Sequence, residues 1–165
     1  MPSTAMGQRT SRRAFVARLL AATPEALVIA GLGSAAYDVF AAGDRERNFY
    51  LWGAMGGATS IGLGLALAQP QQSVVVITGD GEQLMGIGSL GTDLVAVAKG
   101  FGIEDAFSTG SLAASDDIAR RISARSGTLF VQVLIEADEP PRALPPRDGA
   151  YVKNRFRAAL GLKPF

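Results

Sequence analysis

Short apolar runs alternate with segments of helical pattern along this 165-residue chain. Runs of strand length are expected at 26–30, 49–52, 73–78, 106–109 and 128–135. Helices are expected at 11–22, 35–42, 58–69, 93–99, 115–124 and 151–160. Strands that are apolar on both faces and alternate with helices predict an α/β fold, a three-layer doubly wound parallel sheet. The helix at 58–69 has no charged face, which predicts burial on several sides.

Three parts of the chain differ in composition. Residues 1–10 are polar and are expected to form a flexible tail, and residues 11–139 form one domain. Residues 140–165 are expected to form a Pro-rich extended arm followed by a surface helix. Ser11–Val16 is similar to a twin-arginine export signal, but Pro24 and Glu25 interrupt the segment after it. We therefore interpret 11–22 as the first helix, and expect a cytoplasmic protein without a membrane span.

The composition excludes several kinds of chemistry. There is no Cys and no His, which removes thiolate sites, Ser-His-Asp triads and most zinc sites. A net charge of +1 gives no reason to expect nucleic acid or an anionic membrane as a partner. Chemistry must therefore depend on carboxylates, Lys or Arg, backbone groups or a bound cofactor.

Three of the expected strands end in glycine-rich turns: Gly31-Leu32-Gly33-Ser34, Gly53-Ala54-Met55-Gly56-Gly57 and Gly79-Asp80-Gly81-Glu82. Ligands of doubly wound sheets bind at the carboxyl ends of the strands, so the three turns should meet at one edge. Glycines let the backbone approach an anion, and Asp80 supplies a hard oxygen ligand for a cation. The pattern therefore favours a metal-bridged diphosphate at this edge.

Other interpretations of these turns stay open. The spacing Gly31-x-Gly33-x-x-Ala36 matches a dinucleotide fingerprint, but the expected second strand, 49–52, ends without the acidic residue that binds ribose. The first two turns can also serve packing alone, and Gly79-Asp80-Gly81 can be a turn capped by its aspartate. Phosphate contact through Gly33 and Ser34 is the remaining possibility for the first turn.

In sequence order, these residues resemble the diphosphate-binding domain of thiamine-diphosphate-dependent enzymes, most closely the β-type subunits of phosphonopyruvate and sulfopyruvate decarboxylases. The resemblance is close over 26–90 and looser over 91–134. It rests on Arg47-Asn-Phe-Tyr-Leu51, Met55-Gly56, Ser60-Ile-Gly-Leu-Gly-Leu-Ala-Leu-Ala68, Val74-Val-Val-Ile-Thr-Gly-Asp-Gly81 and Gly88-Ser-Leu90.

The resemblance implies a role for each matching residue. Asp80 would be a Mg²⁺ ligand, and Gly79, Gly81 and Glu82 would hold the diphosphate with Gly33 and Ser34. Gly53, Ala54 and Met55 would meet the aminopyrimidine, with the Met55 side chain enforcing the bent shape of thiamine diphosphate. The thiazolium would then serve as the electron sink when a 2-oxo acid loses CO₂.

The sequence departs from the family pattern after Leu90. The family's metal site includes an Asn that lies beyond a further helix end and strand, and here Gly91 continues with a segment that the family places well after that Asn. Either the protein has an internal deletion, or the sequence omits a segment between Leu90 and Gly91. Loss of a central strand would leave its neighbours unpaired, which favours the omission.

The family's activating Glu belongs to another domain, and nothing among these 165 residues resembles that domain. The resemblance therefore implies an α-type partner subunit and at least a dimer, with the chain incomplete as a catalyst alone. Three alternatives stay open: another type of thiamine enzyme, a non-catalytic interaction domain that has lost the metal site, and a Rossmann-type binder. Which 2-oxo acid would be the substrate is not determined by the sequence.

Overall fold

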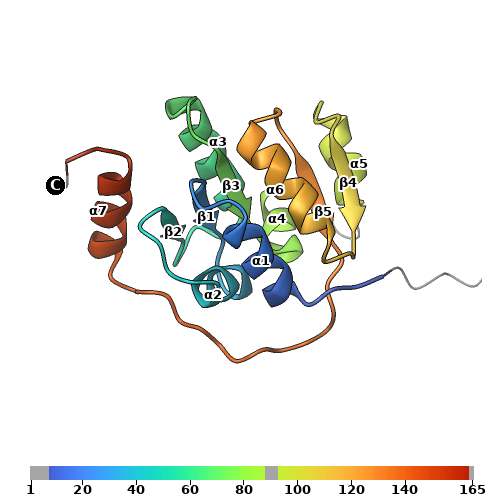
Figure 1. The fold of residues 1–165 in the computed structure, drawn as a ribbon, viewed down its shortest axis with the longest axis horizontal. Helices are drawn as coiled ribbons and strands as arrows, with labels where there is room; N and C mark the ends of the chain where they lie inside the picture. The colour runs from blue at the N-terminus through green and yellow to red at the C-terminus, as the bar shows by residue number, and fades with distance from the viewer. Residues whose placement is uncertain (1–7, 88–92, 164–165) are drawn as a thin grey trace, which may run out of the picture.

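The structure is a computed structural model, and it describes residues 8–87 and 93–163 (Figure 1). The strands are β1 (Leu27–Ala30), β2 (Asn48–Tyr50), β3 (Val74–Ile77), β4 (Ala106–Thr109) and β5 (Phe130–Val133). The helices are α1 (Arg12–Ala21), α2 (Ser34–Ala41), α3 (Ala58–Ala68), α4 (Asp80–Ile87), α5 (Leu94–Gly100), α6 (Ala114–Ala124) and α7 (Gly149–Ala159).

All the strand pairs are parallel, which confirms the predicted parallel α/β fold. The strands form two sheets, one with the order β2-β1-β3 and one made of β4 and β5. In the first sheet Ile29 lies opposite Phe49 on one side and Val76 on the other. In the second, Phe107 lies opposite Val131. Figure 1 shows the second sheet beyond β3, on the side away from β2.

Helices cover both faces of the first sheet, because successive residues of β1 point to opposite faces. Val28 and Ala30 pack with α1 and α2 in one apolar cluster. Leu27 and Ile29 pack with Ala58 of α3 and with α7 in another. The second sheet shares a third cluster with α1 and α6. Helix α1 therefore packs against both sheets.

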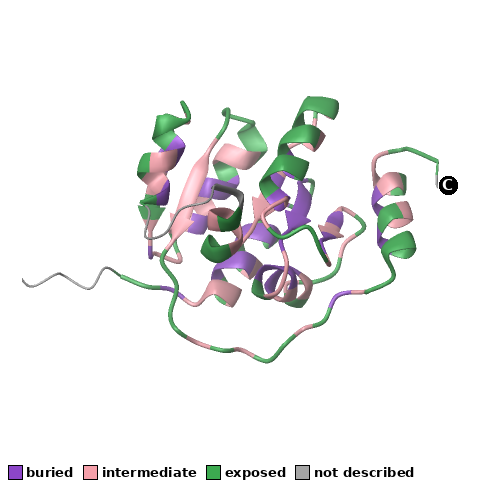
Figure 2. Ribbon diagram, turned by 180° about the vertical axis from the view of Figure 1, so that it is seen from behind, coloured by how far each residue is buried: buried purple, intermediate pink, exposed green. Residues whose placement is uncertain are grey.

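Helix α3 has an uncovered apolar face, so the prediction that it is buried on several sides was wrong. Its buried side packs on β3, where Gly62 lies so close to Val76 that a Cβ would overlap the valine side chain. On the other side, Leu63 is 61% exposed and Leu67 is 75% exposed. No described element covers this face, which is green in Figure 2.

Several element ends differ from those predicted. Strand β2 ends at Tyr50 rather than at residue 52, and β5 is shorter than 128–135. Thr10 is buried and forms a parallel bridge with Ile135. Most of the expected tail, residues 1–7, and the junction between residues 90 and 91 lie outside the described residues. Within the described part of the chain, no helix has the length and apolar character needed to cross a membrane.

A buried carboxylate joins α1 to α2. The Asp38 side chain is 2% exposed and lies 2.5 Å from Arg12 Nε and 3.0 Å from Arg13 Nε. Two guanidinium groups compensate one carboxylate, which satisfies a charge that would otherwise be costly to bury. This contact fixes the first two helices against each other on one face of the first sheet.

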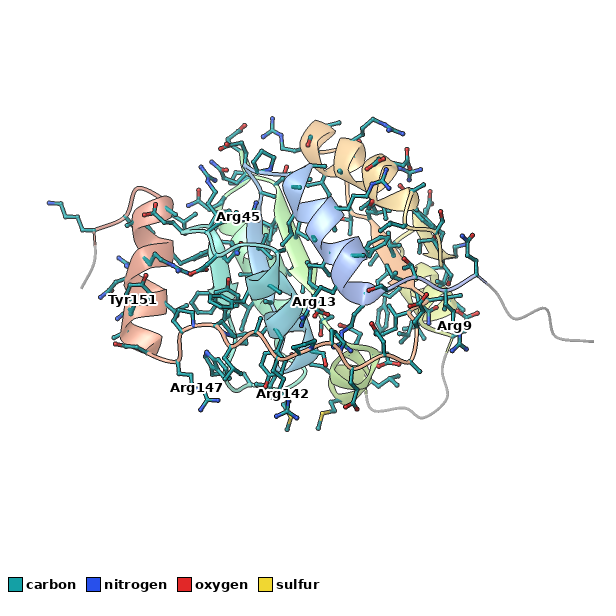
Figure 3. All side chains as sticks on the ribbon, turned by 60° about the horizontal axis from the view of Figure 1, so that its bottom comes forward. Arg9, Arg13, Arg45, Arg142, Arg147 and Tyr151 are labelled. Atoms are coloured by element: carbon teal, nitrogen blue, oxygen red, sulfur yellow. The ribbon has the colours of Figure 1, made fainter. Side chains whose placement is uncertain are left out.

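The strap, residues 136–148, connects β5 to α7 and carries the chain back to the first sheet (Figure 3). Arg13 donates a hydrogen bond to the Pro141 carbonyl at 2.7 Å, and the Trp52 indole donates to the Pro146 carbonyl at 2.8 Å. Because Trp52 follows β2, the strap passes the carboxyl end of that strand. The Arg147 guanidinium lies 5.2 Å from the centre of the Trp52 ring.

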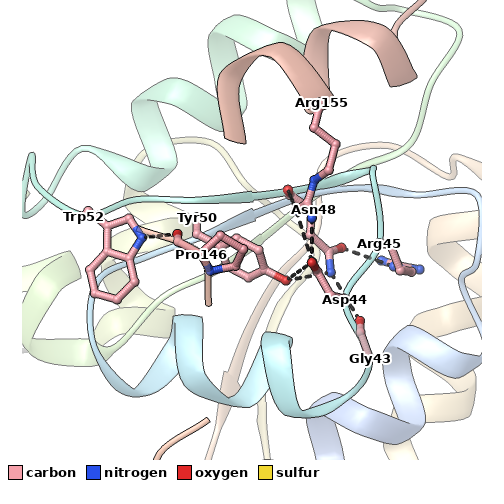
Figure 4. Close-up of polar contacts among 8 residues, drawn as sticks. All are labelled: Gly43, Asp44, Arg45, Asn48, Tyr50, Trp52, Pro146 and Arg155. Atoms are coloured by element: carbon pink, nitrogen blue, oxygen red, sulfur yellow. Dashed lines mark hydrogen bonds and ion pairs between the residues drawn. The ribbon is translucent and has the colours of Figure 1, made fainter. Parts of the chain in front are cut away.

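Helix α7 is fixed to β2 by a polar network, drawn in Figure 4, and by apolar packing. Arg155 donates to both carboxylate oxygens of Asp44, at 2.5 and 3.0 Å. The Tyr50 hydroxyl donates to the same carboxylate at 2.8 Å. The rings of Phe49 and Phe156 pack with their centres 5.4 Å apart. The last helix therefore belongs structurally to the first sheet.

Candidate functional site

The three glycine-rich turns predicted from the sequence lie at the carboxyl ends of β1, β2 and β3. These strands are neighbours in one parallel sheet, so their carboxyl ends meet at the same edge. Backbone bonds continue past the strands, with Gly31 N–H donating to the Ile77 carbonyl at 2.8 Å and Leu51 N–H to the Ala30 carbonyl at 3.0 Å. The predicted convergence of the turns is therefore present in the fold.

The turn after β1 opens α2 without a side-chain cap. Gly33 is the N-cap residue and has φ +75°, a conformation that favours glycine. Ser34 is the first residue of the helix and is exposed. The first amides of a helix have no partner within the helix, and they can donate to an anion.

The turn after β2 contains two residues with positive φ, Ala54 at 55° and Gly56 at 83°. Gly57 N–H donates to the Ala54 carbonyl at 2.8 Å, and a Cβ on Gly57 would lie 2.9 Å from that oxygen. Gly53 is exposed, and the Met55 side chain is 59% exposed. This turn therefore presents open backbone and one flexible apolar side chain to the solvent.

The turn after β3 starts α4 with its acidic residues. Gly79 and Gly81 are exposed, and a Cβ at either position would meet no other segment of the chain. Asp80 is exposed, and its Oδ1 accepts a hydrogen bond from Gly81 N–H at 2.7 Å. Asp80 thus lies where a cation at the edge of the sheet could reach it.

Glu82 connects the third turn to the first. Its Oε2 accepts hydrogen bonds from Leu32 N–H at 3.1 Å and from the Thr78 hydroxyl at 2.8 Å. Gly31 makes room for this carboxylate, because a Cβ there would overlap Glu82 Oε2. Leu32 and Thr78 were not among the predicted site residues. The contact of Leu32 with Glu82 spans 50 positions and leaves no local pattern in the sequence, whereas Thr78 lies only four positions before Glu82.

Gln83 connects the same helix to the second turn. The Thr59 hydroxyl, in the first turn of α3, donates to Gln83 Oε1 at 2.6 Å. Two consecutive side chains of α4 therefore contact the segments that follow β1 and β2. Neither Thr59 nor Gln83 belongs to a motif that sequence reasoning singled out.

The residues present fit an anion better than a complete metal site. The Glu82 carboxylate already receives one hydrogen bond from Leu32 in the first turn and one from Thr78 after β3, so an anion is bound between these two segments in the present structure. Asp80 is a suitable Mg²⁺ ligand, but the described residues contain no group of three or more His, Cys, Asp or Glu side chains able to hold a metal. Asn48 is buried at the amino end of β2, and Asn154 lies on α7.

The strap carries basic side chains. Arg142 and Arg147 are exposed on the strap and lie along the edge that faces the viewer in Figure 3. Arg45 donates to the carbonyls of Thr23 and Pro24, at the amino end of the first sheet. The strap thus brings basic side chains to this edge from a distant part of the sequence.

Comparison with known proteins supports the resemblance seen in the motifs. Residues 31–92 match the family described as "Thiamine pyrophosphate enzyme, C-terminal TPP binding domain". The resemblance of this segment to thiamine-diphosphate-dependent enzymes is therefore confirmed, and the matched segment contains all three turns.

Curated relatives point to the same group. A phosphonopyruvate decarboxylase of Streptomyces viridochromogenes is 45% identical over 85 residues, which cover 51% of this chain and 21% of the relative. The sulfopyruvate decarboxylase subunit beta of Methanocaldococcus jannaschii is 48% identical over 66 residues, covering 40% of this chain and 35% of the relative.

A sulfopyruvate decarboxylase of Methanosarcina acetivorans is 25% identical over 187 residues, covering 93% of this chain and 48% of the relative. The chain therefore spans less than half the length of each of these relatives. The last alignment is longer than the chain, so this relative has residues in the matched stretch that have no counterpart here.

Proposed function

We propose that this chain is the thiamine-diphosphate- and Mg²⁺-binding subunit of a 2-oxo-acid decarboxylase of the phosphonopyruvate and sulfopyruvate type. The observation that carries the proposal is the meeting of three glycine-rich turns at one sheet edge, within the segment that matches the thiamine-enzyme family. When bound, thiamine diphosphate supplies a thiazolium that accepts the electrons left when a 2-oxo acid loses CO₂.

The residues of this chain would bind and orient the cofactor. Asp80 would hold Mg²⁺, and the amides at Gly33, Ser34 and Gly81 would donate to the diphosphate. The backbone of Gly53 and Ala54 would face the aminopyrimidine, with the exposed Met55 side chain beneath it. These assignments rest on the matching positions of the family motif and on the open geometry of the turns.

The chain would need a partner that brings the activating carboxylate. Two observations support this: the curated relatives include proteins named as beta subunits, and the apolar face of α3 is uncovered. The proposed partner is an α-type subunit, or an equivalent domain, that carries the pyrimidine-binding part of the site. Burying the exposed Leu63 and Leu67 against it would remove apolar surface from water.

The decisive measurement is calorimetric titration of the chain with thiamine diphosphate in the presence and absence of Mg²⁺. We expect binding that needs the metal and is lost in Asp80→Asn. The matched control is Asp117→Asn, since Asp117 is also an acid in the first turn of a helix but lies on α6. Equal binding by all three proteins, with or without Mg²⁺, would contradict the proposal.

A second candidate is a non-catalytic interaction domain that keeps the thiamine-enzyme fold. The observation that favours it is that the described residues hold no cluster of three metal-binding side chains and place both asparagines away from Asp80. This candidate predicts association with a partner protein without any uptake of cofactor. The titration above, repeated with the partner present, separates the two.

A further inference from the structure

The Glu82 side chain has the position and the chemistry of a bound anion. Its carboxylate reaches back from α4 to the turn after β1, and one of its oxygens accepts from Leu32 N–H in that turn and from the Thr78 hydroxyl directly after β3. Gly31 has no side chain, and a Cβ at that position would overlap the same oxygen. The chain therefore fills a small anion position with one of its own carboxylates.

The second carboxylate oxygen is less well accommodated. Glu82 Oε1 is buried and has no hydrogen-bond partner among the described residues. A buried acceptor without a partner is unfavourable, and more so when it carries charge. The Glu82 carboxylate is thus hydrogen-bonded through one oxygen only. An anion whose oxygens all find hydrogen-bond partners can therefore replace it.

We propose that the Glu82 side chain is a built-in competitor for the anion position of the site, which a diphosphate must displace from Leu32 and Thr78. This inference rests on the proposed function. A carboxylate and a phosphate cannot share one pair of donors, because like charges at such a distance repel. Displacement returns Glu82 to water and frees both donors for the diphosphate. Of Glu82, only the main chain then remains to hold the ligand.

The test is a titration with inorganic pyrophosphate and Mg²⁺, and separately with thiamine diphosphate and Mg²⁺, on the whole chain. We expect Glu82→Ala to bind both ligands at least about tenfold more tightly than the unchanged protein, since the internal competitor is gone. Glu46→Ala is the matched control, because Glu46 is an exposed glutamate in the loop before β2. Unchanged or weaker binding by Glu82→Ala would overturn the inference.

A second variant separates competition from a general loosening of the turn. Gly31→Ala should expel the carboxylate and also fill the anion position, so both ligands should bind more weakly. Gly31 has no positive φ, so alanine is compatible with its backbone. Circular dichroism of each variant checks that the fold is kept. Tighter binding by Gly31→Ala would contradict the assigned anion position.

The amide of Leu32 provides a direct readout. Its NMR resonance should shift in Glu82→Ala without ligand, and should shift again when pyrophosphate is added. These measurements distinguish a failure of the competitor inference from a failure of the proposed function. If the unchanged protein binds in an Asp80-dependent way but Glu82→Ala gains nothing, only the competitor inference fails. If neither protein binds either ligand, the proposed function fails together with it.

Discussion

Strands β1 and β5 are both mainly apolar, with Gln132 as the one polar residue of β5, but they have very different surroundings. Every residue of β1 is at most 1% exposed, whereas all four residues of β5 are only partly buried (Figure 2). The reason is that β1 has a hydrogen-bonded strand on each side, whereas within the described part of the chain β5 pairs with β4 alone. An apolar sequence shows that a strand is suited to burial. The elements that pack beside the strand in the fold decide whether its side chains are fully buried.

Strand β3 shares this feature of β5, since among residues 8–87 and 93–163 it pairs only with β1. Both are rich in β-branched residues, which is typical of strands inside a parallel sheet. One further parallel strand between them would give each a second neighbour. This arrangement supports the expectation that a segment is missing between residues 90 and 91, as does the longer alignment with the Methanosarcina acetivorans relative.

The largest expected effect on the free energy of unfolding comes from a core substitution in the first sheet, compared with one in the second sheet. Ile29→Ala should lower the free energy of unfolding by about 4 kcal/mol, because the side chain is fully buried and leaves a cavity. Val131→Ala, in β5, should cost about 1 kcal/mol, since it is partly exposed and loses fewer atoms. Urea unfolding followed by circular dichroism measures both, and equal losses would remove the contrast.

The buried ion pair between α1 and α2 should come next. Asp38→Ala is expected to destabilise the protein by about 3 kcal/mol, because Arg12 and Arg13 keep their charges and lose their shared partner. Both guanidinium groups retain some contact with solvent, which limits the loss. The free energy of unfolding at neutral pH measures it. If Asp38→Ala lowers the free energy of unfolding by less than Val131→Ala does, the contact between α1 and α2 contributes little to stability.

Tyr50 should give a smaller and pH-dependent effect. Burial raises the pKa of its hydroxyl well above the usual range, and Asn48 and Asp44 are its hydrogen-bond partners. The unfolded chain loses this proton near pH 10 and the folded chain does not, so stability should fall as the pH rises above about 10. Tyr50→Phe should cost about 1 kcal/mol at pH 7 and make the alkaline decline shallower. Unfolding curves from pH 7 to pH 11 test this.

The smallest effect is expected from the exposed ion pair between α1 and α6. Arg18 lowers the pKa of Asp116 through a direct hydrogen bond, and both side chains are 44% exposed. Solvent screens such pairs, so Asp116→Asn should change the melting temperature little, and added salt should abolish even that difference. A loss as large as that of Asp38→Ala would mean that this pair holds α1 to α6 more strongly than its exposure suggests.

The elements that the sequence predicted best are those with a local signal. Helix α6 and strand β4 match their expected ranges closely, and the three turns meet as the rule for parallel sheets requires. The prediction for α3 failed because a helix without charged residues is suited to burial on several sides, but its sequence does not show whether another element packs there. Side-chain contacts such as Glu82 with Leu32 were also missed, since the backbone path decides which distant residues meet.

The packing of α7 on β2 has a consequence for the order of events during synthesis. Arg155 contacts the Asn48 carbonyl across 107 positions, and Phe156 packs on Phe49. On the ribosome, β2 emerges before β3, β4, β5 and the strap, and the helix that covers Phe49 emerges only after all of them. The apolar surface of β2 therefore stays uncovered while these segments are made, and this interval is when a chaperone has the most to protect.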